Sequence, residues 1–114
     1  MNGPRIEKRS PAFDDLRRHA LYLAGVTDAS VARRFLESVE KAFATLAKMP
    51  SMGRIRGFPH FELGEMRSWP VPGFERYLIF YRELPNGIEV IRIIHGMRNL
   101  DRIFGGESNS DANA

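Results

Sequence analysis

The first half of the chain carries two amphipathic helical patterns joined by a very short segment, which is the strongest constraint on its fold. The first pattern follows Ser10 and Pro11, a favoured cap and first-turn pair, and ends at Gly25. The second follows Asp28 as its cap and ends at Pro50. Helices joined this closely pack as an antiparallel hairpin. Their apolar faces are formed by Phe13, Leu16, Ala20 and Leu23, and by Val31, Phe35, Val39, Ala42, Phe43 and Leu46.

The second half is rich in β-branched and aromatic residues and predicts strands. Residues 50–64 contain several glycines and prolines, so we expect a loop there. Strands are expected over residues 66–71, 77–84 and 88–95, with a turn at Pro72-Gly73 and a type I′ hairpin pair at Asn86-Gly87. Simple alternation in the last strand places Ile91 and Ile93 on one face, and Val90, Arg92 and Ile94 on the other.

The order of these elements predicts a small α+β domain. Ile6 lies in a segment that predicts a further strand before the helices, and residues 99–104 predict a short helical turn. The helical hairpin must cover one face of a small antiparallel sheet, because neither layer can bury its apolar side alone. The 114 residues allow one domain. We expect it to span residues 1–104, followed by a disordered tail over residues 105–114.

The composition excludes several classes of site. The chain has no cysteine, which excludes disulfides, thiolate metal sites and a cysteine nucleophile. No metal-ligand spacing is present, and we expect neither a metal nor a cofactor. Apolar runs are too short for a membrane span and the first residues lack a signal-peptide pattern, so a cytoplasmic protein is expected. The net charge of +3 is too small to indicate a dedicated nucleic-acid module.

Several basic side chains on the predicted strands suit phosphate chemistry. Arg67, Arg82, Arg92 and His95 come together if the strand register allows it, since arginine binds phosphate oxygens in a fork and an imidazole suits proton transfer. The alternatives are solvated sheet-face arginines and a strand-end histidine bonded to backbone. For Arg92, inside an apolar strand, we favour a buried ion pair with Glu89, Asp14 or Asp15.

Three further side chains have two interpretations each. Arg54 and Arg56 flank the glycine-bearing loop and either hold phosphate or lie solvated. Trp69 either packs on the sheet or forms an exposed anchor for a partner.

The longest motifs of the chain resemble a known family. They are the helical hairpin, the P-S-M-G segment at residues 50–53, M-R-S-W-P-V-P-G-F-E-R-Y-L-I-F-Y-R at residues 66–82, and G-I-E-V-I-R-I-I-H-G-M-R-N-L at residues 87–100. Together they are similar to toxins of the RelE/ParE superfamily, the toxin halves of bacterial type II toxin–antitoxin modules. The resemblance covers about Ile6 to Phe104 and implies a helical hairpin on an antiparallel sheet.

The superfamily divides by activity, and both branches stay open here. RelE-like members cleave messenger RNA in the ribosome, whereas ParE-like members poison DNA gyrase without covalent chemistry of their own. The Y-L-I-F-Y-R strand and the H-G-x-R ending resemble the ParE branch more closely. RelE-like enzymes use lysines and arginines on the loop and sheet, and this chain has no lysine after Lys48. A non-toxic member that only binds antitoxin is a third hypothesis.

Each branch implies different functional residues. A nuclease of this family would use His95, Arg67, Glu65 and Arg82, with Glu62 as an alternative to Glu65. A gyrase poison would contact its target through a surface that we place at Arg67, Trp69, Arg98, Arg102 and Phe104.

The resemblance also implies a partner. A cognate, ParD-like antitoxin with a DNA-binding region would wrap its tail around the toxin to give a hetero-oligomer. A tail of this kind binds in the groove of the hairpin or adds a strand to an exposed sheet edge. We place its contacts on the hairpin, at Leu16, Leu23, Phe35, Val39 and Phe43.

Overall fold

The computed structural model describes residues 3–57 and 65–96. In these ranges the elements are β1 (Arg5–Lys8), α1 (Ser10–Val26), α2 (Ala29–Lys48), the 3₁₀ turn η1 (Pro50–Met52), β2 (Arg54–Arg56), β3 (Met66–Val71), β4 (Phe74–Leu84) and β5 (Gly87–His95). The predicted α+β architecture is confirmed. None of the described helices has the length and hydropathy needed to cross a membrane. The helical turn and tail predicted beyond residue 96 lie outside the described residues.

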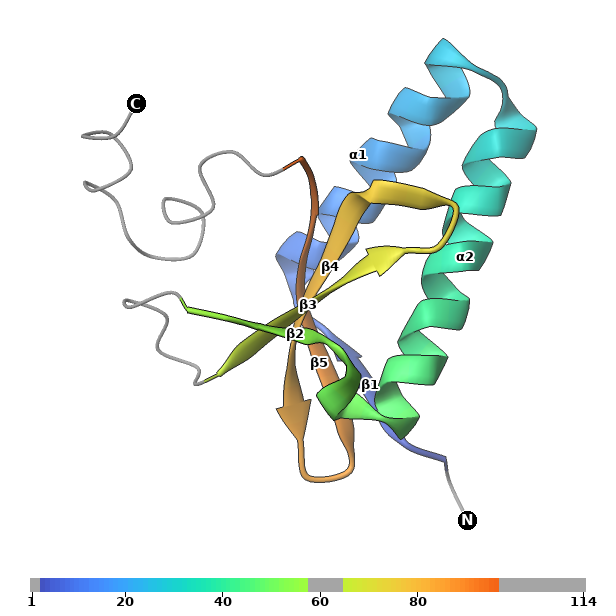
Figure 1. Ribbon diagram of the computed structural model, residues 1–114. Helices are drawn as coiled ribbons and strands as arrows, with labels where there is room; N and C mark the ends of the chain where they lie inside the picture. Colours follow the sequence, from blue (N-terminus) through green and yellow to red (C-terminus); the bar gives the residue numbers. More distant parts are fainter. Residues whose placement is uncertain (1–2, 58–64, 97–114) are drawn as a thin grey trace, which may run out of the picture.

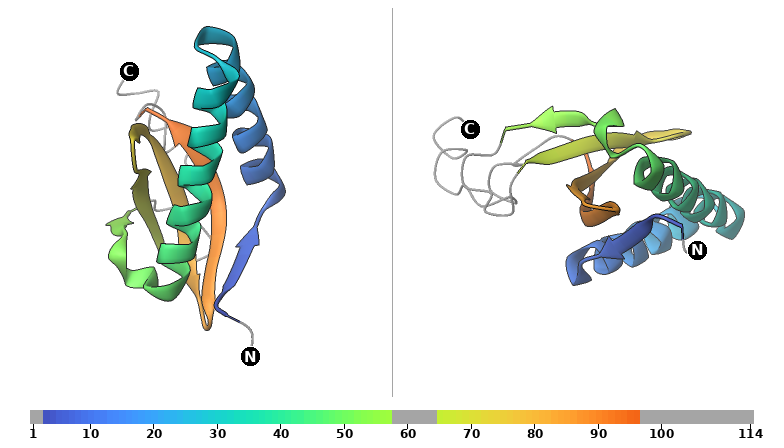
Figure 2. Two further views of the ribbon diagram at one scale, coloured as in Figure 1. Left: turned by 90° about the vertical axis from the view of Figure 1, so that its right-hand side faces the viewer. Right: turned by 90° about the horizontal axis from the view of Figure 1, so that it is seen from below.

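The two helices pack side by side on one face of the sheet (Figures 1 and 2). Asp28 caps α2 as predicted, because its carboxylate accepts hydrogen bonds from the backbone N–H groups of Ser30 and Val31. The predicted end of α1 at Gly25 is wrong. The helix continues to Val26, and the Thr27 hydroxyl closes it by donating to a carbonyl of the last turn.

The sheet has the order β1-β5-β4-β3-β2 and is mixed. The β2, β3, β4 and β5 strands pair antiparallel, whereas β1 runs parallel to β5, from Arg5 opposite Gly87 to Lys8 opposite Val90. A purely antiparallel sheet was expected, but the hairpin of two helices returns the chain so that its first strand lies parallel to the last. The predicted loop over residues 50–64 also contains η1 and β2. β2 is too short for a propensity signal and forms because it pairs with β3.

The β4–β5 turn differs from the type I′ prediction. Leu84 pairs with Gly87, so Pro85 and Asn86 are the turn residues and Gly87 already belongs to β5. Among the described glycines, only Gly73 and Gly96 have positive φ. Gly87 is required instead for close approach, because a Cβ there would overlap the carbonyl of Arg5 in β1.

A β-bulge in β5 changes which side chains face the helices. Phe80 of β4 pairs with Arg92 whereas Tyr81 pairs with Val90, which leaves Ile91 as the extra residue. Val90 and Ile93 therefore pack in the core beneath the helices, and Ile91 joins a second apolar cluster with Met66, Phe80 and Ile94. The alternation predicted for this strand is wrong because the bulge shifts its phase. The largest side chains of the core under the helices are Phe35, Phe43, Leu46, Ile79, Tyr81 and Ile88.

Candidate functional surfaces

The predicted cluster of arginines does not form, because each guanidinium has its own partner in the fold. Arg82 Nε contacts Glu89 Oε1 at 2.6 Å across the β4–β5 ladder. Arg92 forms the ion pair predicted for it, with Asp15 of α1. These pairs neutralise the charge that a phosphate site would need on each strand.

Arg67 acts as a clamp on the segment that follows α2. Its Nη1 donates to the carbonyl oxygens of Gly53 at 2.8 Å and Ser51 at 3.2 Å, and its Nη2 lies 3.5 Å from Glu65. The Tyr81 hydroxyl serves the same segment, since it donates to the Pro50 carbonyl and accepts from the Gly53 N–H. Burial raises the pKa of Tyr81, so the phenol stays protonated as this pair of bonds requires.

The strand register also separates the residues of the nuclease hypothesis. His95 lies opposite Tyr77 on one side of β4, whereas Arg67 lies opposite Tyr81 on the other side. The two β4 positions are about 13 Å apart along the strand at the usual rise per residue. Glu65 stays beside Arg67 and far from the imidazole. These four residues therefore provide no single place for a general acid, a general base and a phosphate.

Asp15 is the centre of a buried polar network between α1 and β5. Its carboxylate, only 1% exposed, accepts from Arg92 Nε at 2.7 Å, Arg92 Nη2 at 3.0 Å and Arg18 Nη2 at 2.7 Å. It also accepts from the backbone N–H of Ile93 at 2.9 Å, while His19 Nε2 donates to the Ile93 carbonyl at 2.8 Å. Because β1 ends opposite Val90, these two side chains of α1 replace a strand partner for the rest of β5. Sequence analysis found Asp15 as a candidate and missed the role of His19.

A pocket of about 300 Å³ lies beside this network and is lined by Arg18, His19, Tyr22, Tyr77 and His95. The Tyr77 ring lies between the two imidazoles, with ring centroids 4.9 Å from His19 and 4.6 Å from His95. Burial lowers the pKa of His19 and raises that of Tyr77, so both side chains are neutral near pH 7. The imidazole of the strand-end His95 thus packs on the Tyr77 ring.

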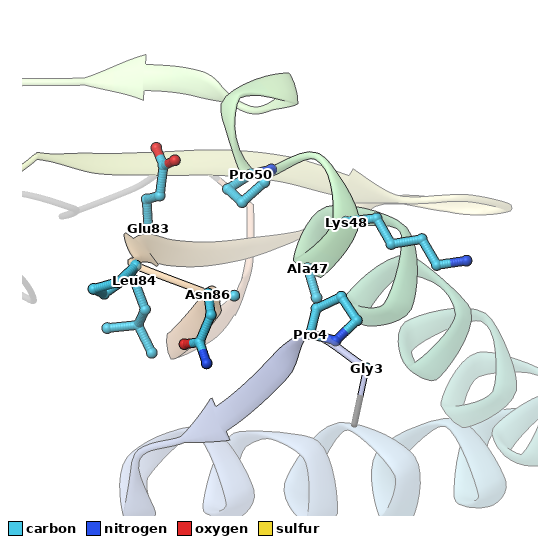
Figure 3. A pocket seen from close by; sticks show the side chains of 10 residues that line it. Gly3, Pro4, Ala47, Lys48, Pro50, Glu83, Leu84 and Asn86 are labelled. Carbon is cyan, nitrogen blue, oxygen red and sulfur yellow. The ribbon is translucent and has the colours of Figure 1, made fainter. Parts of the chain in front are cut away.

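A second pocket of about 490 Å³ lies where the start of β1, the end of α2 and the β4–β5 turn meet. Figure 3 shows Pro4 beside Ala47, with Leu84 and Glu83 across from them. The lining is mixed, with apolar side chains beside the charged Lys48 and Glu83 and the amide of Asn86. It contains no convergent set of proton donors and acceptors, so it does not indicate a catalytic centre. No group of three potential metal ligands occurs among the residues described.

The five side chains predicted to contact an antitoxin lie in the core of the domain. Leu16 and Leu23 are each 9% exposed, and Phe35, Val39 and Phe43 are fully buried under the hairpin. They shape the hairpin from inside, because the sheet covers them in the folded chain. The large apolar side chains that the hairpin leaves exposed are Phe13, Leu21, Tyr22 and Val26 of α1 and Leu36 of α2. We call these five residues the hairpin surface.

The predicted target-binding residues divide into two groups. Trp69 is partly buried and packs against the main core, and Arg67 is the clamp described above. Arg98, Arg102 and Phe104 lie outside the described residues.

Comparisons with known proteins agree with this architecture. Residues 6–100 match the family model described as the ParE toxin of the type II toxin–antitoxin system parDE. No curated protein matches the sequence. A solved structure, the chromosomal ParDE system from P. aeruginosa, contains a chain that superposes with a TM-score of 0.68 at 14% identity. That alignment covers 82% of this chain and 97% of the other, and it shows a shared fold. The family match extends from β1 through all the described strands, and the chain therefore belongs to the ParE toxin family of type II toxin–antitoxin systems.

Proposed function

We propose that this chain inhibits growth by poisoning DNA gyrase and is neutralised by a cognate antitoxin. The observation that carries the proposal is the ParE family match over residues 6–100. The geometry supports this branch over an RNA-cleaving one, because the Glu65–Arg67 pair, the Arg82–Glu89 pair and His95 lie at separate places on the sheet. A gyrase poison needs a binding surface and no convergent acid and base. We place the target contacts in the segment that holds Arg98, Arg102 and Phe104, together with Trp69 and Arg67.

A gyrase assay on the toxin freed of antitoxin tests the first half of the proposal. We expect inhibition of supercoiling and an accumulation of cleaved DNA that disappears when antitoxin is added. The double variant Arg98→Ala/Phe104→Ala should lose inhibition. The control is Arg33→Ala, which removes an exposed arginine of α2 and should keep inhibition. A preparation that still binds antitoxin but leaves gyrase unaffected would refute the proposal. Ribosome-dependent cleavage of messenger RNA would then be tested, with His95→Ala as the variant.

The second half of the proposal places the antitoxin on the hairpin surface. Its aromatic and aliphatic side chains are more than a third exposed, and Tyr22 and Val26 are neighbours on α1 at i and i+4. Exposed apolar side chains scattered singly are common, whereas neighbouring ones such as Tyr22 and Val26 favour an interaction site. An amphipathic tail that folds against them would bury this area. The result would be a hetero-oligomer.

Substitutions that leave the core untouched test the antitoxin contact. Leu21→Asp and Val26→Asp should each weaken antitoxin binding by tenfold or more, which is about the effect of losing a residue that contributes strongly to an interface. Asn86→Asp adds the same charge at the exposed β4–β5 turn and should leave binding unchanged. Isothermal titration gives the affinities, and circular dichroism checks that the variants fold. Equal affinities for all three variants would show that the antitoxin does not bind at the hairpin surface.

A further inference from the structure

One partly buried arginine of the sheet has no carboxylate partner in the part of the chain that the structure describes. Of the partly buried arginines in residues 3–57 and 65–96, Arg67 contacts Glu65, Arg82 contacts Glu89 and Arg92 contacts Asp15. Within these described ranges, Arg56 of β2 forms no ion pair and makes one hydrogen bond, from Nη1 to the Ser68 hydroxyl at 3.0 Å. A charged group taken partly out of water is unfavourable unless an opposite charge compensates it.

A second guanidinium increases this excess of positive charge. Arg54 lies two residues before Arg56 on β2, so both side chains stand on the same face of the strand. Arg54 is exposed and, among the described residues, it too has no ion pair. Burial lowers the pKa of Arg56, and the like charge of Arg54 lowers it further. The fold thus holds two repelling cations side by side at the edge of the sheet.

The surroundings of this pair fix the position of Arg56 at the edge of the sheet. The Ser68 hydroxyl, only 4% exposed, accepts a hydrogen bond from Arg56 Nη1 at 3.0 Å and so fixes the position of the guanidinium from within the fold. The Arg56 guanidinium also lies over the Phe80 ring, 5.6 Å from its centroid, which holds it in place. β2 is the edge strand among the described strands, so part of its backbone N–H and C=O groups face away from the rest of that sheet.

We infer that Arg54 and Arg56, with Arg56 positioned by the Ser68 hydroxyl, form a binding site for the phosphodiester backbone of a nucleic-acid strand. Two guanidinium forks in a row match repeated single negative charges along an extended strand, and each fork can bind two phosphate oxygens. The site lies on the sheet face away from the helices, since Phe80 belongs to the apolar cluster on that face. It is therefore separate from the hairpin surface, and both can be occupied at once.

This inference goes beyond the proposed function, because it gives the chain a direct contact with nucleic acid in the absence of gyrase. It concerns the sugar–phosphate backbone rather than base sequence, since these groups contact no base edges. The two sources of that backbone are single-stranded DNA and RNA, and the experiment measures both.

Fluorescence anisotropy of labelled DNA and RNA oligonucleotides with the full chain, freed of antitoxin, tests the site over a series of salt concentrations. The double variant Arg54→Gln/Arg56→Gln should lower the affinity for the oligonucleotide by about a hundredfold, because each lost charge-assisted contact costs about tenfold. The slope of log K against log salt should fall by about 0.7 for each phosphate contact removed. The Arg56→Lys variant keeps the charge without the fork and should give an intermediate affinity.

The matched control is Arg33→Gln/Arg76→Gln, which removes the same charge from two exposed arginines without ion pairs in the described structure. Thermal unfolding of each variant checks that the fold is intact. The inference is wrong if the wild-type chain binds neither oligonucleotide at 50 mM salt, or if the two double variants lose affinity equally. It is also wrong if Arg54 and Arg56 prove to bind only the antitoxin, with nucleic-acid affinity unaffected by their loss. A larger loss for DNA or for RNA identifies which strand the site takes.

Discussion

Replacing Asp15 with alanine tests whether α1 truly acts as a strand partner for β5. The substitution leaves the Arg92 guanidinium, whose side chain is 27% exposed, without its carboxylate, and leaves the backbone N–H of Ile93 unpaired. Breaking a buried ion pair on one side costs about 3–5 kcal/mol, and a buried unpaired donor costs about 1–3 kcal/mol. Because Arg92 keeps some contact with water, we expect a combined loss of about 4 kcal/mol in the free energy of unfolding. A domain of this size has only about 5–15 kcal/mol in total.

The neighbouring residue provides the control. Asp14 forms an ion pair with Arg17 at 3.3 Å, but both side chains are more than 60% exposed. Asp14→Ala should therefore change the free energy of unfolding by no more than about 0.5 kcal/mol. Urea unfolding followed by circular dichroism gives both values. A loss below about 1 kcal/mol for Asp15→Ala, or equal losses for the two variants, would refute the role of the network.

A double-mutant cycle keeps the test informative if Asp15→Ala barely folds. Removing Arg92 as well should restore part of the stability, because the uncompensated cation is then gone. The unpaired N–H of Ile93 would remain, so the recovery should be incomplete.

Three further predictions concern single positions. Tyr81→Phe removes the hydroxyl that forms hydrogen bonds with the segment after α2, and it should lower the free energy of unfolding by about 1–3 kcal/mol in urea. An unchanged urea midpoint would refute this prediction. Gly87→Ala should destabilise the fold by about 1–3 kcal/mol, because its Cβ would overlap the backbone of Arg5. Gly25→Ala, in open space within α1, should stabilise the fold by up to about 1 kcal/mol. Equal shifts of the unfolding temperature for the two variants would contradict both expectations. The hydrogen bonds from Ser30 and Val31 lower the pKa of Asp28 below its model-peptide value of 3.8, so its cap should stabilise the fold above about pH 4 and lose this effect as the pH falls through the lowered pKa. The stability difference between wild type and Asp28→Ala should accordingly shrink in acid, and a difference independent of pH would argue against the cap.

Local signals predicted most of the elements because their causes are local. The two helices follow from apolar periodicity, and the Asp28 cap from the residues beside it. β3 has the predicted bounds of Met66–Val71. β4 begins earlier than predicted, at Phe74. The short β2 was not predicted, because three residues are too few to show the alternation of apolar and polar side chains that indicates a strand.

The candidate site was less predictable because it depends on which strands pair and in what register. Arg92 was expected to form a buried ion pair with one of three acids, and only the position of α1 over β5 selects Asp15. The bulge at Ile91 likewise depends on the pairing of β4 with β5, and it reverses the faces assigned to half of the last strand. For Arg54 and Arg56 the sequence leaves a solvated and a phosphate-binding interpretation open, and only the structure places them together, with no carboxylate partner among the described residues.

The sequence by itself thus determined the order of helices and strands, the α+β class and the family, because periodicity, caps and motifs are properties of neighbouring residues. The tertiary structure decided which charges are neutralised and which remain available. Arg82 and Arg92 have the same chemistry as Arg56, but strand pairing and helix packing bring a carboxylate to each of the first two, whereas no described carboxylate reaches Arg56. An ion pair forms only where the fold holds both charges within contact distance, and that distance is set by strand register and helix placement rather than by separation along the chain.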